Sequence, residues 1–185
     1  MVYQSLSEIF NALNETRQTI YKRVEGLEPK QYCFKEEAGR WSVAGVIEHI
    51  GAAEARIVLR VRELIERAEA AGQLTPAQPF RPISVDEITS RTTATKFQAP
   101  EAFQPKQDLA LNELLAKIRS SRKELIVLRP KFDEFELSEL KFTHPAFGPL
   151  DLYQWLVLTV MHESRHLDQI DRILACPDFP RATAS

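Results

Sequence analysis

Residues 161–174, MHESRHLDQIDRIL, decide which fold this chain can adopt. The stretch continues a long apolar segment and places two histidines, His162 and His166, four residues apart. On an α-helix, residues i and i+4 lie one above the other on the same face, so the two imidazoles can converge on one point. Gln169 follows three residues after His166 and extends the same stripe. The stretch therefore predicts a long helix that carries part of a metal site.

Length, composition and charge limit what the rest of the chain can be. With 185 residues and 44% hydrophobic content, the chain can bury one core and is short for two, so we expect a single domain over residues 1–185. Its 24 basic and 26 acidic side chains are interspersed, which predicts no nucleic acid and no anionic membrane as a partner. The amino terminus does not resemble a signal peptide, and Cys33 and Cys176 form no CxxC pair. These features predict a cytoplasmic protein.

Apolar residues at three- and four-residue spacing predict four helices. Ser42 is the expected N-cap of the second helix. Asp151 and Gln154 form a capping-box pattern at the start of the fourth helix, which is the clearest helix start in the sequence. The expected helices cover residues 6–27, 43–71, about 107–128, and 151 onward.

The connection between the second and third helices, residues 73–106, is unusually long and contains five prolines. Prolines interrupt regular structure, so we expect a crossover that runs the length of the domain, with one short helix capped by Ser84 and supported by Glu87. Residues 131–149 are expected to be irregular. Four helices without a convincing strand pattern predict an all-α fold, a four-helix bundle with a long proline-rich crossover.

A third histidine, His49, lies inside the second predicted helix. Gly45, Ala52 and Ala53 are its small neighbours and leave a hollow on its face. A lone histidine on an apolar helix face is more often a packed core residue than a ligand. Helix bundles, however, build metal sites from side chains on facing helices, and His49 would complete a three-histidine donor set. Three neutral imidazoles suit Zn²⁺, Ni²⁺ or Fe²⁺ and leave a coordination position open to water or substrate.

The string HESRH also matches HExxH, the metalloprotease pattern, in which the glutamate, here Glu163, is the general base. Those proteases usually take a third ligand from further along the chain, and the 19 residues after His166 contain neither histidine nor glutamate. Glu163 is therefore expected to pair with a base such as Arg165 or Arg56, and a peptidase is disfavoured.

The fourth histidine, His144, precedes Pro145 in a predicted loop. Its neighbours are typical of a turn, so we expect a histidine that packs or caps this loop. Alternatively it borders the mouth of the site. We do not expect it to be a metal ligand.

Taken in order, these motifs resemble the DinB/YfiT-like family of metal-binding four-helix bundles. The segment APEAFQP before the third helix is also similar to the crossover of that family. The matching residues are Trp41-Ser42 with His49, His144-Pro145 with Gly148, and His162, His166, Gln169 and Ile170.

The resemblance implies a divalent metal, zinc or nickel, held by His49, His162 and His166. Relatives include S-transferases that use bacillithiol, mycothiol or glutathione, and a mycothiol-dependent isomerase. The leading hypothesis is therefore a metal-dependent S-transferase that joins a low-molecular-weight thiol to a small electrophile. The alternatives are a metal-dependent hydrolase and a non-catalytic, stress-related bundle with a structural metal. The resemblance is also compatible with a homodimer.

Two further residues are expected to contact a small-molecule substrate or thiol. Arg56, seven residues after His49, could anchor a carboxylate, or it could form a salt bridge on the charged half of its helix. Gln169 could donate a hydrogen bond to substrate or support a ligand, or it could be a buried amide that closes a helix contact.

Overall fold

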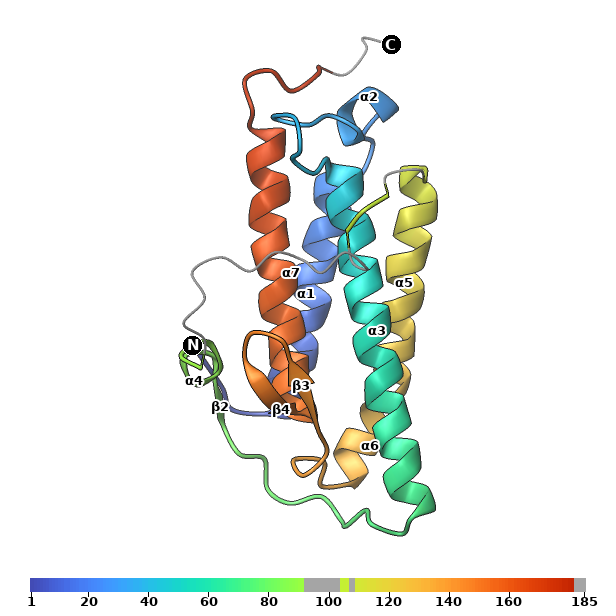
Figure 1. Cartoon of the computed structure of the whole chain (residues 1–185), viewed down its shortest axis with the longest axis vertical. Helices are drawn as coiled ribbons and strands as arrows, with labels where there is room; N and C mark the ends of the chain where they lie inside the picture. The colour runs from blue at the N-terminus through green and yellow to red at the C-terminus, as the bar shows by residue number, and fades with distance from the viewer. Residues whose placement is uncertain (92–103, 107–108, 182–185) are drawn as a thin grey trace.

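The computed structural model describes residues 1–91, 104–106 and 109–181, and four long helices dominate this part of the chain (Figure 1). They lie side by side and confirm the predicted all-α four-helix bundle. Within it α1 packs on α7, α3 packs on α5, and α3 also packs on α7. The four are α1 (Leu6–Val24), α3 (Val43–Ala70), α5 (Leu111–Val127) and α7 (Leu152–Leu174).

The direction of the helices explains why the chain needs a long crossover. Figure 1 shows that α3 and α5 run the same way along the bundle, so the chain must return along its length between them. The third helix begins at Leu111, after the extended N-cap Ala110, and not at about Gln107 as predicted. Gln107 itself and residues 92–103 of the crossover lie outside the described residues. Its described beginning holds β2 (Ile83–Ser84), which pairs with β1 (Val2–Tyr3), and the short α4 (Val85–Thr89).

Local capping signals in the sequence begin the helices where they were expected. Ser42 Oγ accepts the Gly45 N–H at 3.2 Å, and Ser84 Oγ accepts the Glu87 N–H at 3.4 Å. Asp151 Oδ1 accepts the Gln154 N–H at 2.8 Å, and the Gln154 side chain accepts the Asp151 N–H in return, which confirms the capping box.

Two further boundary predictions were wrong. The first helix ends at Val24 instead of residue 27, because Glu25 is extended and Gly26 takes a positive φ of 75°. Residues 131–149 are not irregular throughout. They contain most of α6 (Arg129–Glu134) and a hairpin of β3 (Lys141–His144) and β4 (Gly148–Asp151).

The β3–β4 hairpin was missed because its strands are only four residues long. Its pattern is nonetheless alternating, since Phe142 and His144 are half-buried while Lys141 and Thr143 are exposed. The hairpin packs on α7, where the Phe142 and Trp155 rings stack with centroids 4.0 Å apart. The Trp155 indole N–H also donates to the Phe142 carbonyl at 3.1 Å.

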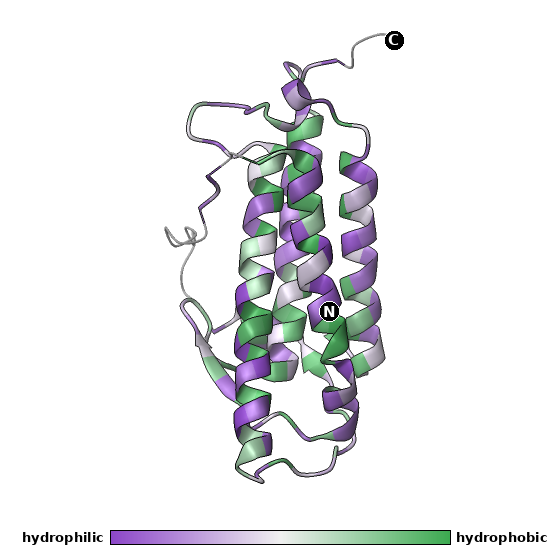
Figure 2. Ribbon diagram, turned by 90° about the vertical axis from the view of Figure 1, so that its right-hand side faces the viewer, coloured by the Kyte–Doolittle hydropathy of each residue, from purple (hydrophilic) through white to green (hydrophobic). Residues whose placement is uncertain are grey.

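Two apolar clusters fill the bundle, and each long helix contributes to both. Figure 2 shows hydrophobic and hydrophilic positions alternating along the helices, as amphipathic helices require. On each of the four long helices, one charged residue lies between the residues of the first cluster and those of the second. On α1, for example, Arg17 lies between Leu13 of one cluster and Ile20 of the other. The four separating residues, which we call the ion-pair layer, are Arg17, Glu54, Arg122 and Glu163.

The ion-pair layer is buried and its charges cancel, since two guanidiniums face two carboxylates. Arg17 donates to Glu163 and to Glu54, at 2.9 Å in each case. Arg122 donates to Glu54 at 2.7 Å, and its Nη2 lies 2.9 Å from Glu163 at an angle too bent for a hydrogen bond. Burial alone would raise the pKa of Glu54, but Arg122 and Arg17 hold that pKa below its ordinary value. The layer thus ties all four helices together.

No helix in the described part of the chain is long and apolar enough to cross a membrane.

Removing one charge from the layer should be costly, and the chain offers a matched control. Glu54→Gln leaves two buried guanidiniums against one carboxylate, and we expect a loss of about 3–5 kcal/mol in the free energy of unfolding. Glu124→Gln breaks the Arg62–Glu124 pair, which also joins α3 to α5 but is 35% and 49% exposed. That change should cost no more than about 1 kcal/mol. Urea unfolding measures both, and equal losses would contradict a special role for the layer.

Candidate metal site

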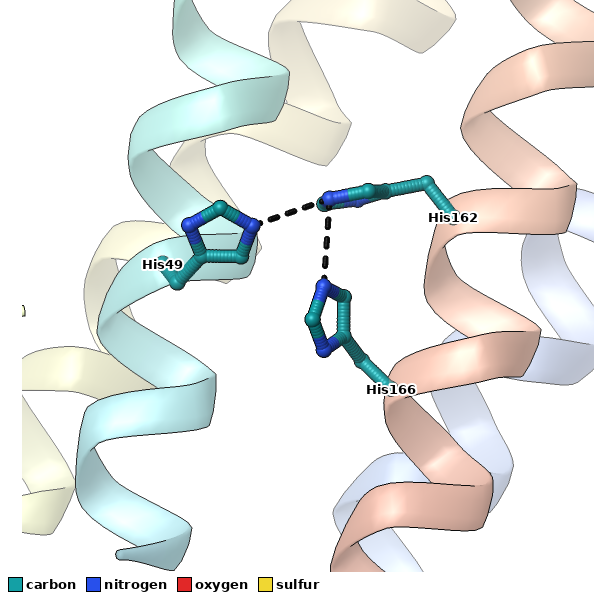
Figure 3. A group of neighbouring side chains, drawn as sticks. All are labelled: His49, His162 and His166. Carbon is teal, nitrogen blue, oxygen red and sulfur yellow. Dashed lines mark hydrogen bonds between the residues drawn. The ribbon is translucent and has the colours of Figure 1, made fainter. Parts of the chain in front are cut away.

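Helices α3 and α7 bring three histidines together in the bundle (Figure 3). The Nε2 atom of His162 lies 3.0 Å from the Nε2 atom of His49 and 3.2 Å from that of His166. All three ligand atoms lie within 4.8 Å of one another. His162 and His166 stand one turn apart on α7, and His49 faces them from α3. The three-point donor set expected from the sequence is therefore present in space.

The geometry fits a small tetrahedral cation. Zinc binds imidazole nitrogen at about 2.0–2.1 Å, which places two nitrogens of a tetrahedral site about 3.3 Å apart. The observed separations of 3.0 and 3.2 Å are close to that value. Among the described residues, no carboxylate or thiol joins the three imidazoles. The arrangement thus has the three protein ligands of an open site, whereas closed structural zinc sites have four.

Gln169 fixes the protonation of His166. Its amide oxygen lies 2.9 Å from His166 Nδ1, and an amide oxygen can only accept a hydrogen bond. The proton of the neutral ring is therefore on Nδ1, and the Nε2 lone pair faces the other imidazoles. Metal-binding histidines are commonly oriented in this way. The structure places Gln169 as a support for His166, and its contact with a substrate stays a prediction.

Burial keeps the imidazoles of His162 and His166 neutral. It lowers the pKa of His162 well below the ordinary value, and the neighbouring His166 and His49 lower it further. Burial also lowers the pKa of His166 to about 4, although the hydrogen bond to Gln169 opposes the shift. Neutral imidazole is the form that binds a metal, so these two rings are ready to do so at neutral pH.

The ring of Trp41 packs against the site. The half-buried Trp41 lies just before the N-cap of α3, with its ring centroid 4.8 Å from that of His49 and 6.2 Å from that of His166. The only sequence signal for a place of Trp41 at the site was its position in the resembling motif, eight residues before His49.

Glu163 does not face the three histidines. It is 1% exposed, belongs to the ion-pair layer, and also accepts a hydrogen bond from Thr16 Oγ1 at 3.0 Å. The expected pairing with Arg165 or Arg56 was wrong, because one residue along a helix turns the side chain by about 100°, here into the bundle. A glutamate held by two guanidiniums is poorly placed to act as a base, so the geometry argues against a peptidase.

The remaining candidates lie outside the cluster. Arg56 is exposed on α3, about 10.5 Å along the helix axis from His49, and its role as a carboxylate anchor stays a prediction. His144 is not part of the three-histidine group and lies on the hairpin, with its ring 5.4 Å from that of Trp155. Burial lowers the pKa of His144.

Comparison with known proteins gives consistent results. The family model of the DinB superfamily matches residues 12–170. YuaE of Bacillus subtilis (strain 168), described as an uncharacterized protein, is 22% identical over 162 residues, which cover 86% of this chain and 93% of YuaE. The crystal structure of TT2238, a four-helix bundle protein, superposes with a TM-score of 0.62 at 20% identity and covers 91% of this chain and 99% of TT2238. This structural likeness supports the fold alone.

The neutral histidines should make the metal-free protein sensitive to mild acid. Between pH 6.5 and about 4 the unfolded chain binds protons on His162 and His166 while the folded chain does not, so stability falls as pH falls. For His166, a pKa lowered from 6.5 to about 4 corresponds to about 3 kcal/mol of unfolding free energy lost by pH 4. Urea unfolding of chelator-treated protein measures this loss. In His166→Phe, the loss of unfolding free energy between pH 6.5 and about 4 should be smaller by about 3 kcal/mol. An unchanged dependence of unfolding free energy on pH would contradict a lowered pKa of His166.

Proposed function

Since the chain belongs to the DinB superfamily, we propose that it is a divalent-metal-dependent enzyme that transfers a small thiol to an electrophile. One observation carries the proposal. Three imidazoles converge from two helices, and no fourth protein ligand joins them among the residues that the structure describes. Such a donor set suits a metal that keeps a position for an exchangeable ligand.

In this proposal His49, His162 and His166 hold the metal, with zinc or nickel preferred and Fe²⁺ as a further candidate. A divalent cation held there acts as a Lewis acid and lowers the pKa of a thiol or water that it binds. Gln169 keeps the His166 Nε2 lone pair directed at the centre. Trp41 packs beside His49 and His166 and helps to exclude water from them.

The thiol version is preferred over a hydrolase because of the acid–base groups near the site. A free thiol has a pKa of about 8.5, whereas bulk water has one of about 15.7, so a thiol needs less help to ionise. No carboxylate belongs to the described cluster, and Glu163 is engaged in the ion-pair layer. In the transfer itself, the thiol sulfur bonds to the electrophilic carbon. The leaving group departs with its electron pair, and the thiol proton passes to solvent.

Measuring the metal content of the protein tests whether the three histidines bind a metal. Wild-type protein dialysed against Zn²⁺ or Ni²⁺ and then against buffer should keep about one ion per chain and gain thermal stability from it. His162→Ala should lose both. Asp168→Ala is the matched control on α7, since its side chain is exposed, and it should keep both. Equal metal content in the wild type and His162→Ala, measured by elemental mass spectrometry, would refute the site.

The transfer part is tested by turnover. Metal-loaded protein is incubated with bacillithiol, mycothiol or glutathione and an activated aryl halide, and the thioether product is measured. We expect a thiol-dependent rate that His49→Ala lowers at least about 100-fold and Asp168→Ala leaves unchanged. Hydrolysis of an activated ester without any thiol, abolished by His49→Ala, would favour the hydrolase instead.

A further inference from the structure

We propose that Trp41 is a positioning residue of the three-histidine site, and that its indole holds the imidazoles of His49 and His166 at the separation that a bound metal requires. The inference rests on the proposed function, because it needs a metal at that site. It gives Trp41 no contact with the substrate and no part in the transfer itself.

The ligands of the site come from two helices. His162 and His166 share α7, so helix geometry sets their spacing. His49 reaches the centre from α3 (Figure 3), so its distance from the other two depends on how α3 packs on α7 and on how its own side chain is held. A binding constellation works only when its side chains are kept within about 0.5 Å of the productive geometry. The cross-helix separation therefore has to be fixed by packing.

The ring of Trp41 contacts one histidine from each helix. Its centroid lies 4.8 Å from that of His49, with the planes at 44°, and 6.2 Å from that of His166, with the planes at 23°. The rings of His49 and His166 are themselves 4.8 Å apart, with their planes at 67°. Each of the three rings thus lies against the other two. A large rotation of either imidazole would displace the indole.

His49 has little lateral support from its own helix. Its neighbours on the same face of α3 are Gly45, Ala52 and Ala53, which have small side chains or none. His49 is nevertheless only 6% exposed, so groups from other parts of the chain cover it. The indole of Trp41 is the largest aromatic ring that a protein can place there.

The two tryptophans of the chain have different surroundings. Trp155 stacks on Phe142 and its indole N–H donates to the Phe142 carbonyl at 3.1 Å, so Trp155 docks the hairpin on α7. Trp41 makes its ring contacts with His49 and His166, and its indole N–H donates to no residue in the described part of the chain. The contacts of Trp41 are therefore with the site.

The backbone near Trp41 is anchored at both sides. Trp41 directly precedes the N-cap of α3. Earlier in the same connection, the Gln31 side-chain amide donates to the Pro180 carbonyl at 3.0 Å, and the rings of Phe34 and Phe179 meet edge to face with centroids 5.6 Å apart. The connection before α3 is thus tied to the segment that follows α7. A rigid support of this kind is what a positioning residue needs.

Three substitutions test the inference. Trp41→Ala removes the indole, whereas Trp41→Phe keeps a smaller ring that can still pack on the imidazoles. Trp155→Phe is the matched control, because it also replaces an indole by a phenyl ring, but at a position whose ring contacts are with Phe142 and His144. The probe is Co²⁺, since its visible absorption reports both its binding and the arrangement of its ligands.

We expect the Co²⁺ Kd to rise about tenfold or more in Trp41→Ala, the usual effect of removing a group that orients metal-binding histidines. Trp41→Phe should lie between Trp41→Ala and wild type. Trp155→Phe should stay within about twofold of wild type, because it orients no ligand. The visible spectrum of bound Co²⁺ should also change in Trp41→Ala, whereas a role in stability alone would leave that spectrum as it is in wild type.

A Co²⁺ Kd in Trp41→Ala within about twofold of wild type would overturn the inference. Equal losses of affinity in Trp41→Phe and Trp155→Phe would also overturn it, because the loss would then follow general stability. This second comparison decides if Trp41→Ala does not fold.

The inference and the proposed function fail in different ways. If wild-type protein takes up no Co²⁺, the proposed function is wrong and the inference falls with it. If wild type and all three variants bind Co²⁺ equally well, only the inference is wrong.

Discussion

Four charged side chains meet in the middle of the bundle, one from each long helix, and their charges cancel. A buried charge is tolerated only beside its partners, so sliding any helix by one turn would leave a charge unpaired in the core. Glu163 directly follows His162 on α7, and Glu54 is five residues after His49 on α3. The register that pairs the charges therefore also sets His49 opposite His162.

The core contains two groups of polar side chains, the ion-pair layer and the three-histidine site. The layer keeps Glu54 ionised between two guanidiniums, whereas burial keeps His162 and His166 neutral at the site. Glu163 and His162 are neighbours in sequence but face different environments, because one residue along a helix turns the side chain by about 100°. The HExxH pattern carries catalytic meaning only when its glutamate is available to the metal centre, and here Arg17 and Arg122 engage Glu163.

The sequence predicted those features of the fold and the site that depend on local structure. The caps at Ser42 and Asp151 use atoms three residues away, and the spacing of His162 and His166 follows from helix periodicity. The sequence could not predict the ion-pair partner of Glu163, because Arg17 is 146 residues away and the side of a helix that is buried depends on the helices packed against it. The hairpin was missed since four-residue strands show too few alternations.

The charge balance of the ion-pair layer has a consequence for synthesis of the chain. As the protein emerges from the ribosome, Arg17, Glu54 and Arg122 are all made before Glu163. Until α7 arrives, any partly assembled bundle holds two guanidiniums against one carboxylate and cannot bury them without an unpaired positive charge. The first three long helices must therefore keep their centre in contact with water. The arrival of Glu163, adjacent to His162, completes the charge balance and the candidate metal site in the same step.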